Sequence, residues 1–314
     1  MIYTLTMNTA IDLFIHLESF GFNTVNRSTY DELQPNGKGI NVSLVLKMLE
    51  VPSTALGFIG GFTGEYIKQA IERKGITTNF ITVEGDTRVN VFTHVDEANQ
   101  EFKLVNRGPE IADLAQRQLM AIISQLSHDD LIIISGSLPR GIQPTFLVQM
   151  VRQLHSQGVR TVIDTSYPEV LETLSENPYL LKPNIEELEQ WIGHDISDRA
   201  HAVIECQRLI DKGAKQILLS LGSEGALYVD QDQAYSVNAP AGKVINTACA
   251  GDTLLGTFLA QRLKGKSVAE SLRYASAAGS STAFSTGLTD FSDIDILLQQ
   301  VKVTPISLTK EMEL

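Results

Sequence analysis

The chain has 314 residues, 43% hydrophobic and 20% charged, which is an ordinary balance for a folded globular protein. Its formal net charge of −12 at pH 7 excludes a general nucleic-acid binder, because such proteins need a basic surface. No apolar run approaches the length of a membrane span and no signal-peptide pattern occurs, so we expect a cytoplasmic protein that binds neither membrane nor nucleic acid.

Short β-rich segments alternate with helical patterns along most of the chain. Strands such as 131–135 are apolar on both faces, as expected for a parallel sheet that helices cover on both sides. The pattern therefore predicts an α/β fold with a mostly parallel central sheet. The predicted strands are 2–7, 54–59, 131–135, 160–164, 179–182 and 216–220. The predicted helices are 42–50, 64–74, 114–126, 144–157, 185–191, 199–212, 252–264 and 268–284.

Two stretches, about 12–34 and 87–106, break this alternation. Val89, Val91 and Val95 alternate with other residues, which indicates half-exposed antiparallel strands without partner helices. We interpret both stretches as a small β-sheet inserted in the α/β core, where it serves as a lid or a dimer surface. Neither a linker nor a repeat divides the sequence, so residues 1–314 are predicted to form a single domain.

A glycine-rich turn precedes the predicted helix 42–50, with Lys38 between Gly37 and Gly39. The glycines let the backbone approach a ligand closely, while Lys38 and Asn41 supply a positive charge and an amide. The plain alternative is a glycine turn with a solvated lysine. Neither a G-x-x-x-x-G-K-[ST] loop nor a G-x-G-x-x-G motif after a strand occurs, which disfavours a dinucleotide-dependent oxidoreductase.

Other polar side chains follow the predicted strands or flank the two exceptional stretches. Asp12 follows the first strand at the edge where parallel sheets bind ligands, and its carboxylate suits sugar hydroxyls. Arg88 and, more weakly, Arg107 offer guanidinium groups that match a phosphate. Ser137, in the turn after strand 131–135, suits an oxyanion. The alternatives are a turn-capping aspartate, surface arginines and a purely structural turn.

Asn184 and Glu187 lie three residues apart at the start of the predicted helix 185–191. They therefore share a face and can hold water molecules on Mg²⁺. A capping box, in which each side chain binds the other's backbone, is an alternative that does not exclude the first interpretation. The turn 220–226, which contains Gly222 and Gly225, suits contact with the phosphate or ribose of a nucleotide.

The run 246–258 delivers Asp252 through a turn of small residues onto the start of an apolar-faced helix. Free backbone N–H groups in the first turn of a helix form an anion site, because the peptide dipoles leave partial positive charge there. A carboxylate beside an anion site suits the deprotonation of a hydroxyl next to a phosphate. The alternative is that Asp252 only complements the helix dipole.

In this order and spacing, the motifs closely resemble those of the ribokinase-like PfkB family of carbohydrate kinases. The resemblance extends from residue 8 to residue 287, and 37–41 and 246–258 are similar to the two family signatures. Within the family the chain is most similar to the branch of bacterial 1-phosphofructokinases and tagatose-6-phosphate kinases. The segments that suggest this branch are 25–27, 37–43, 57–61, 85–90, 136–139 and 277–284.

The resemblance implies a role for each of several residues. Asp252 is expected to be the general base that removes the proton of the acceptor hydroxyl. The backbone N–H groups of Ala250, Gly251 and Asp252 are expected to form the anion hole for the transferred phosphoryl group. The residues expected to hold the sugar are Asp12, Gly37 and Asn41. The residues expected to meet its existing phosphate are Lys38, Arg88, Ser137 and Arg27.

The resemblance also implies ATP and Mg²⁺ as cofactors. The residues expected to serve them are Lys182, Asn184, Glu187, Ser220, Gly222 and Gly225, with Ala277 and Ser281 near the adenine. Among these, Glu187 and Asn184 would hold the metal ion through water. The β lid of the family is often a dimer clasp, which implies a homodimer through the lid strands.

The implied reaction is the ATP-dependent phosphorylation of fructose 1-phosphate to fructose 1,6-bisphosphate. The alternatives are a tagatose-6-phosphate kinase and a catalytically weak sugar-phosphate sensor on the same fold. Three residues depart from the branch: Thr9 replaces its usual proline, Asn36 its glycine, and Cys249 a glycine or alanine. The first two concern the identity of the sugar, while the retained Gly251 and Asp252 favour an active enzyme over the sensor.

Overall fold

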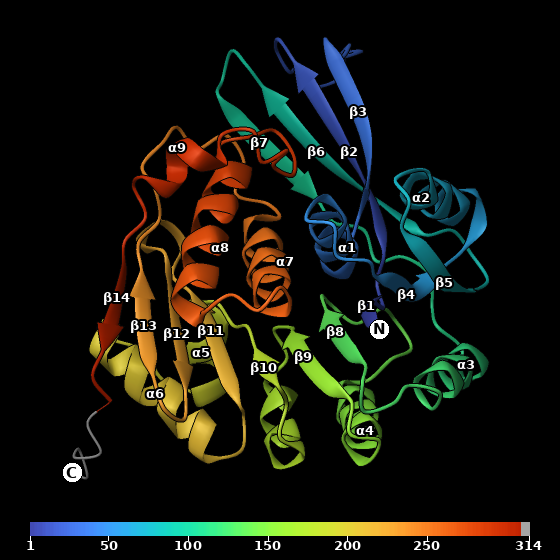
Figure 1. The fold of residues 1–314 in the computed structure, drawn as a ribbon. Helices are drawn as coiled ribbons and strands as arrows, with labels where there is room; N and C mark the ends of the chain where they lie inside the picture. Colours follow the sequence, from blue (N-terminus) through green and yellow to red (C-terminus); the bar gives the residue numbers. More distant parts are fainter. Residues whose placement is uncertain (309–314) are drawn as a thin grey trace.

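The computed structural model describes residues 1–308, in which ten strands form one large sheet (Figure 1). The predicted single domain also includes residues 309–314, which lie outside the described residues. The strand order is β14 (Val303–Ile306), β13 (Ala234–Val237), β12 (Ala226–Asp230), β11 (Gln216–Ser220), β10 (Leu180–Leu181), β9 (Arg160–Asp164), β8 (Leu131–Ser135), β1 (Ile2–Thr6), β4 (Thr54–Ile59) and β5 (Thr77–Thr82). From β11 to β5 the strands are parallel, while β12, β13 and β14 are antiparallel.

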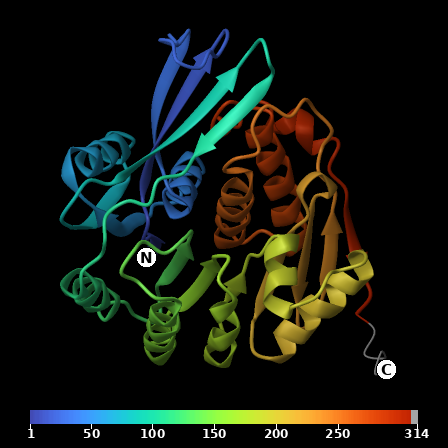
Figure 2. The same cartoon turned by 180° about the vertical axis from the view of Figure 1, so that it is seen from behind.

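Strand β8 shows how the large sheet separates two apolar cores. Side chains alternate along a strand, so Ile132 and Ile134 face one core while Leu131 and Ile133 face the other. The first core is covered by α3 (Asp113–Ile123), α4 (Pro144–Ser156), the 3₁₀-helix η1 (Pro168–Glu176), α5 (Ile185–Ile192) and α6 (Arg199–Asp211). The opposite face is covered by α1 (Lys38–Met48), α2 (Gly61–Arg73), α7 (Ala250–Leu263), α8 (Val268–Ala283) and α9 (Ile294–Leu298) (Figures 1 and 2). These layers confirm the predicted α/β fold.

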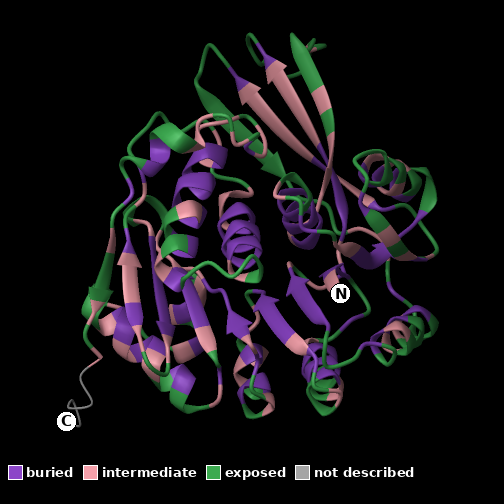
Figure 3. Ribbon diagram, in the orientation of Figure 1, coloured by how far each residue is buried: buried purple, intermediate pink, exposed green. Residues whose placement is uncertain are grey.

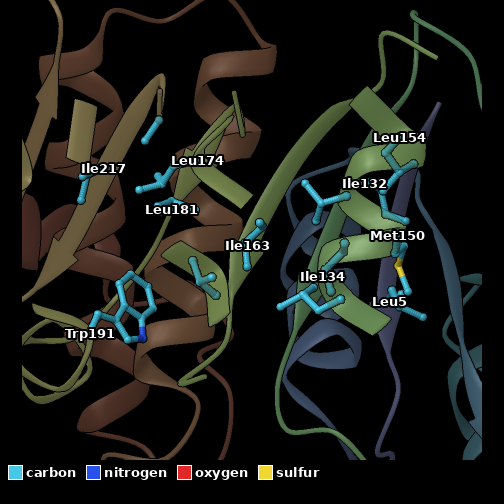
Figure 4. Packing of buried hydrophobic residues seen from close by; sticks show 14 of the residues in the cluster. Leu5, Ile132, Ile134, Met150, Leu154, Ile163, Leu174, Leu181, Trp191 and Ile217 are labelled. Atoms are coloured by element: carbon cyan, nitrogen blue, oxygen red, sulfur yellow. The ribbon is translucent and has the colours of Figure 1, made fainter. Parts of the chain in front are cut away.

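The first core illustrates the packing. Figure 4 shows Ile132 and Ile134 beside Leu5 of β1, with Met150 and Leu154 of α4 packed against them. All five side chains are fully or almost fully buried. Close packing of this kind makes the large sheet a rigid platform for the loops at its edge.

A second, four-stranded sheet stands at one edge of the large one, in the order β3 (Tyr30–Asn36), β2 (Ala10–Leu17), β6 (Arg88–Val95) and β7 (Gln100–Leu104). Its strands are largely half-buried or exposed (Figure 3), as their sequence pattern indicates. The antiparallel prediction holds for β2 with β3 and for β6 with β7, but β2 and β6 are parallel. Both strands leave the same edge of the large sheet, with Ala10 opposite Arg88, so they run in the same direction.

Helices α1 and α7 pack against each other beside the small sheet (Figure 1). Gly256 makes this approach possible, because an added Cβ would lie 2.9 Å from Val45 Cγ1. α1 begins at Lys38 rather than at the predicted residue 42, and α7 begins at Ala250 rather than at Asp252. The N-termini of both helices therefore include the motif residues. Among residues 1–308, no helix has the length and apolar character needed to cross a bilayer.

Candidate active site

The carboxyl ends of neighbouring parallel strands bring the predicted residues to one edge of the large sheet. β1 leads into Asp12, β8 into Ser137 and β10 into Lys182, while Ser220 ends β11. The same edge receives the N-terminus of α1, where a Cβ on Gly37 would lie 2.5 Å from Thr6 Cγ2. With φ at 147° and Thr6 so close, this position requires glycine.

Two lysines converge on a buried carboxylate at the end of β9. Lys38 Nζ lies 3.1 Å and Lys182 Nζ 3.2 Å from Asp164 Oδ1. Burial raises the pKa of Asp164, but Lys182 and Lys38 outweigh it and hold the pKa below its ordinary value. Asp164 Oδ2 is buried and has no hydrogen-bond partner among residues 1–308. The arrangement brings two ammonium groups to this edge although the whole chain is acidic.

Asp252 lies in the first turn of α7 and is buried beside these groups. Asn41 Nδ2 donates a hydrogen bond of 2.8 Å to Asp252 Oδ2. Burial, followed by repulsion from Asp164, raises the pKa of Asp252 to about 7, against the opposing effects of Lys38 and Asn41. The carboxylate is therefore both oriented and unusually basic, which suits proton abstraction near neutral pH.

The N-terminus of α7 offers backbone N–H groups next to Asp252. Its N-cap residue, Cys249, contributes no side-chain cap. Within residues 1–308 no acceptor is found for the N–H groups of Gly251 and Asp252, while the N–H of Ala250 reaches Thr247 O at 3.4 Å. A Cβ on Gly251 would lie only 3.6 Å from Lys182 Nζ. Free N–H groups and an ammonium group thus border the same space, as an anion site requires.

A chain of hydrogen bonds links the predicted sugar-binding residues to Asp252. Asn36 Nδ2 donates to Asp12 Oδ2, and Asn36 Oδ1 accepts from Asn41 Nδ2 at 2.9 Å. Asn90 Nδ2 donates to the other Asp12 oxygen at 2.8 Å. Burial raises the pKa of Asp12, although Asn90 and Asn36 stabilise its carboxylate. Asn36 therefore bridges Asp12 and Asn41, at the position where the chain departs from the glycine expected from the family resemblance.

The predicted phosphate-binding residues differ in how they are held. Arg88 donates to the backbone oxygens of Asn8 at 2.9 Å and Asn106 at 3.2 Å, so it joins the small sheet to the site. Ser137 Oγ accepts from Asn8 Nδ2 at 3.0 Å and is exposed. Arg27 is also exposed, in the connection between β2 and β3. Lys38, Arg88 and Ser137 therefore surround one region, while Arg27 stands apart from it.

On the nucleotide side, Asn184 and Glu187 form a complete capping box at the start of α5. Glu187 N donates to Asn184 Oδ1 at 2.7 Å, and Asn184 N donates to Glu187 Oε2 at 2.9 Å. The other Glu187 oxygen faces Lys38 Nζ at 3.8 Å, so the capping box leaves it directed toward the site. Ser220 is bridged to Asn184 in a parallel pairing.

The remaining predicted nucleotide-binding residues lie in different environments. Gly222 is the first residue of the short 3₁₀-helix η2 (Gly222–Glu224), and Gly225 is its C-cap. A Cβ on Gly222 would meet nothing within 4 Å. Ala277 and Ser281 are buried within α8. The Ser281 hydroxyl is hydrogen-bonded to Thr289 and Asp293, so it does not face the open edge.

A cleft of about 940 Å³ opens beside these residues, between the small sheet, α1 and the segments 246–249 and 285–292. Asp12, Asn36, Asn41 and Cys249 line its inner part. A second hollow of about 710 Å³ shares Phe14 and other residues with it and continues along the same face of the small sheet. Of the predicted sugar-binding residues, Asp12 and Asn41 thus line a cleft large enough for a small substrate.

The sequence patterns do not identify two residues of this site, which are Asp164 and Asn90. Asp164 ends a predicted strand at the same edge as Lys182. A carboxylate at the end of a parallel strand is a feature from which Asp164 could have been predicted as a site residue. Asn90 is opposite Asp12 in the pairing of β2 with β6. That register could not be read from the sequence, because the parallel pairing joins strands far apart in the chain.

Comparisons with known proteins agree with this geometry. The pattern of the family described as pfkB family carbohydrate kinase matches residues 3–295. The chain is 42% identical to the D-tagatose-1-phosphate kinase of Bacillus licheniformis and 36% identical to the 1-phosphofructokinase of Bacillus subtilis, each over 97% of this chain and 99% of the relative. It also resembles phosphofructokinase-2 from Escherichia coli, solved in complex with substrates and products, with a TM-score of 0.88 and 28% identity over 95% of this chain and 98% of the other. The tetrameric inhibited form of that protein gives a TM-score of 0.87 at the same identity and coverage.

Proposed function

Because the chain belongs to the pfkB family of carbohydrate kinases, we propose that it transfers a phosphoryl group from ATP to fructose 1-phosphate, which gives fructose 1,6-bisphosphate. The observation that carries this proposal is the position of Asp252. It is a buried, basic carboxylate beside the free N–H groups of α7 and two lysines, next to a cleft. A base and an anion site in contact are what phosphoryl transfer to a hydroxyl requires.

In the proposed reaction, the sugar lies in the cleft with its hydroxyls on Asp12, Gly37 and Asn41. Asp252 takes the proton of the acceptor hydroxyl, whose oxygen then attacks the terminal phosphorus of ATP while the bond to ADP breaks. The negative charge of the transferred group is stabilised by the N–H groups of Ala250, Gly251 and Asp252 together with Lys182. Lys38, Arg88 and Ser137 bind the existing phosphate of the sugar. Arg27, which stands apart from them within one chain, would reach that phosphate from the lid of a partner subunit.

The nucleotide is proposed to lie along Lys182, Ser220, Gly222 and Gly225, at the ends of β10 and β11. The open space above Gly222 and its positive φ of 57° are compatible with close approach of a phosphate or ribose. Ala277 and Ser281 belong to the helix behind this region, and the buried positions of their side chains leave them a supporting role for the adenine.

The donor set at the site also suits Mg²⁺, which prefers oxygen ligands and keeps several waters. Asp164 Oδ2 has no hydrogen-bond partner among the described residues, and Glu187 Oε1 is not used by the capping box. We propose that Glu187 and Asn184 hold the ion through water, with the free Asp164 oxygen beside them. When bound, Mg²⁺ would neutralise part of the negative charge of the ATP phosphates.

A second candidate substrate is D-tagatose 1-phosphate, the epimer of fructose 1-phosphate at C4. The 42% identity to a D-tagatose-1-phosphate kinase favours it. Asn36, which bridges Asp12 and Asn41, is in a position to discriminate between the two epimers. The phosphorylated hydroxyl is the same in both sugars, so the roles proposed for Asp252 and α7 do not change.

We further propose that residues 1–314 act as one kinase domain in which the small sheet is a lid over the cleft. Its other face carries an apolar row across all four strands, because Leu13 is opposite both Leu33 and Val91, and Val91 is opposite Leu104. Leu33 and Leu104 are exposed. An exposed apolar row of this kind suits a second copy of the chain as partner, which would form a homodimer through the lid.

The experiment that tests the function is an ADP-release assay with a panel of sugar phosphates. The panel contains fructose 1-phosphate, tagatose 1-phosphate, fructose 6-phosphate and tagatose 6-phosphate, each with Mg²⁺. We expect the highest kcat/KM on fructose 1-phosphate. A higher value on either tagatose phosphate would transfer the assignment to that sugar. No turnover on any of them, with tight binding retained, would identify a sensor instead.

A further inference from the structure

Two imidazoles and a buried carboxylate meet between α5 and α6. These helices lie on the side of the large sheet opposite α7 and α8 (Figure 2). His194 follows Gly193, the C-cap of α5, and His201 and Glu205 are one turn apart on α6. One ligand atom from each of the three residues lies within 4.8 Å of the other two. The kinase mechanism uses none of them.

The spacing of the three ligand atoms matches that of a small metal ion. His201 Nε2 lies 3.4 Å and His194 Nε2 3.7 Å from Glu205 Oε1. Two ligands bound at about 2.0–2.1 Å to a tetrahedral Zn²⁺ are separated by about 3.4 Å. The two rings are stacked, with centroids 5.5 Å apart and an interplanar angle of 8°, and each presents its Nε2 to Glu205. Only small side-chain shifts would bring all three atoms to bonding distance.

The surroundings of His194 select the tautomer that a metal ligand needs. Its Nδ1 lies 3.2 Å from the backbone oxygen of Asp195, and a carbonyl can only accept a hydrogen bond. Nδ1 therefore carries the proton, and in the neutral ring the lone pair of Nε2 points at the Glu205 carboxylate. A lone pair opposite a carboxylate is repulsive unless a metal ion or a proton lies between them. A ring held through Nδ1–H to a carbonyl is the usual arrangement of a metal-bound histidine.

His201 is held in the opposite tautomer. The backbone N–H of Ser197 donates a hydrogen bond of 3.3 Å to its Nδ1, so in the neutral ring Nε2 carries the proton that faces Glu205. Metal binding at Nε2 therefore moves this proton to Nδ1, where the Ser197 hydroxyl, 3.4 Å away, can accept it in place of the donated N–H. Both histidines are partly exposed, so an ion can enter from solvent and keep water as its fourth ligand. Imidazole with carboxylate suits Zn²⁺, whereas Mg²⁺ prefers sites made of oxygen ligands alone.

Arg208 is the competing cation at this cluster. Its guanidinium donates a hydrogen bond to Glu205 Oε1, the oxygen that faces both histidines. The Glu205 side chain is only 4% exposed, whereas that of Arg208 is 59% exposed and free to move into solvent. Metal binding therefore displaces Arg208, and removal of Arg208 should strengthen the binding of the ion.

We propose that His194, His201 and Glu205 form a binding site for a divalent transition-metal ion of the Zn²⁺ type. The ion ties the segment 193–197 to α6 through ligands from two elements. Because this cluster is independent of the residues at the active site, the proposal does not depend on the identity of the sugar. The ion has a structural role, and it raises the unfolding temperature by binding the folded chain.

The test is Zn²⁺ binding to the full, chelator-treated chain without nucleotide, measured by competition with a chromophoric chelator. We expect one Zn²⁺ per chain and no binding of Mg²⁺ at this cluster. His194→Ala, His201→Ala and Glu205→Gln should each weaken the affinity by at least about 10-fold, since even the loss of a group that orients a ligand commonly costs about 10–100-fold. Arg208→Gln should tighten it. Co²⁺ bound at the same site should show the visible absorption of a tetrahedral complex, which His194→Ala should abolish.

His128→Ala is the matched control, because His128 is an exposed histidine 3.3 Å from a single carboxylate, that of Asp129. It should leave the Zn²⁺ affinity unchanged. His194 is on the surface, so a folded His194→Ala chain is expected, and its circular dichroism checks this. Absence of Zn²⁺ binding by the wild type, or an affinity unchanged in both His194→Ala and His201→Ala, would overturn the proposal. Either result would mean that the cluster is only an ion pair.

Discussion

Asp252 combines two properties that a general base needs, a fixed orientation and a raised basicity. Asn41 holds one of its oxygens at 2.8 Å, and its burial near Asp164 raises the pKa to about 7. Asp252→Asn keeps the shape of the side chain but cannot accept the proton. We expect kcat to fall by about 10²–10⁴-fold while the Kd of the sugar phosphate changes little. Rapid-quench kinetics together with equilibrium binding would measure both, and near-normal turnover would remove Asp252 from this role.

The raised pKa of Asp252 also predicts a pH dependence. The carboxylate is the active form, and its fraction grows as the pH rises through about 7, so kcat/KM should fall as the pH is lowered below that value. A carboxylate with an ordinary pKa would remain active to about pH 4. The measurement is a pH profile of kcat/KM from pH 5 to 9. A flat profile between pH 5 and 7 would show that burial does not raise the basicity of Asp252 in this way.

Asn36 is the residue at which the sugar end of this cleft departs most from the expected pattern. Its amide bridges Asp12 and Asn41 where a glycine would leave open space. Asn36→Gly removes a polar group that lies beside the proposed sugar-binding residues Asp12 and Asn41. We expect the ratio of kcat/KM for fructose 1-phosphate and tagatose 1-phosphate to move toward one, by about 10-fold if a single hydrogen bond discriminates between them. An unchanged ratio, measured with both epimers, would show that Asn36 does not contact the sugar.

At the scale of a single element, we expect a substitution at the N-terminus of α7 to lower catalytic activity without changing the stability of the fold. A Cβ on Gly251 would lie 3.6 Å from Lys182 Nζ, an ordinary contact, so Gly251→Ala fits the folded chain. We expect the free energy of unfolding to change by less than about 0.5 kcal/mol. The methyl group nevertheless occupies the space in which the phosphoryl group is proposed to meet the N–H groups, so kcat should fall by at least about 10-fold. Urea unfolding and steady-state kinetics on the same preparation test this, and equal activity would place the anion site elsewhere.

Cys249 imposes strain on the same helix terminus. Its φ is 64°, in the left-handed region, and this conformation costs a residue with a side chain about 1–2 kcal/mol. Cys249→Gly removes the strain and the thiol, whereas Cys249→Ala removes only the thiol. We therefore expect the glycine variant to be more stable than the alanine variant by about 1 kcal/mol in urea unfolding. Equal stability of the two would mean that the turn relaxes without glycine.

The start of α1 shows how far helix boundaries can be read from a sequence. Gly37 and Gly39 indicate a loop, so the helix was predicted from residue 42, yet it begins at Lys38. Gly39 serves packing rather than a turn, because its added Cβ would lie 2.6 Å from Thr6 Oγ1. Long-range packing of this kind is not encoded in local propensity. The sequence indicates the start of α7 more closely, within two residues, because small residues in the turn and a following apolar helix both indicate the boundary.

Across the whole molecule, the alternation of strands and helices was enough to predict the parallel sheet, and with it the edge that carries the site. The convergence of Lys38 and Lys182 on Asp164 was not predictable, because it depends on β9 and β10 being neighbours while α1 lies above them. The two exceptional stretches were likewise predicted to form one small sheet. Their parallel pairing, with Asp12 opposite Asn90, depends on how both leave the large sheet.

The small sheet also bears on how copies of the whole molecule associate. Its two faces differ: the cleft face carries Asp12 and Phe14, while the opposite face carries the apolar row that ends at Leu104. Because successive side chains alternate, closure of the lid on the cleft would leave the apolar row in solvent unless another surface covers it. A second copy of the chain would bury it.

We therefore expect the wild type to sediment as a dimer and Leu104→Glu to sediment as a monomer, because a buried, unpaired carboxylate would oppose association. Leu114→Glu is the matched control, since Leu104 and Leu114 are both 62% exposed but Leu114 lies on α3, away from the lid. Sedimentation velocity at several protein concentrations measures the assembly, and kcat/KM on the same samples reports whether lid contacts support catalysis. A monomeric wild type, or a Leu104→Glu variant that remains dimeric, would show that the apolar row is not the contact between subunits.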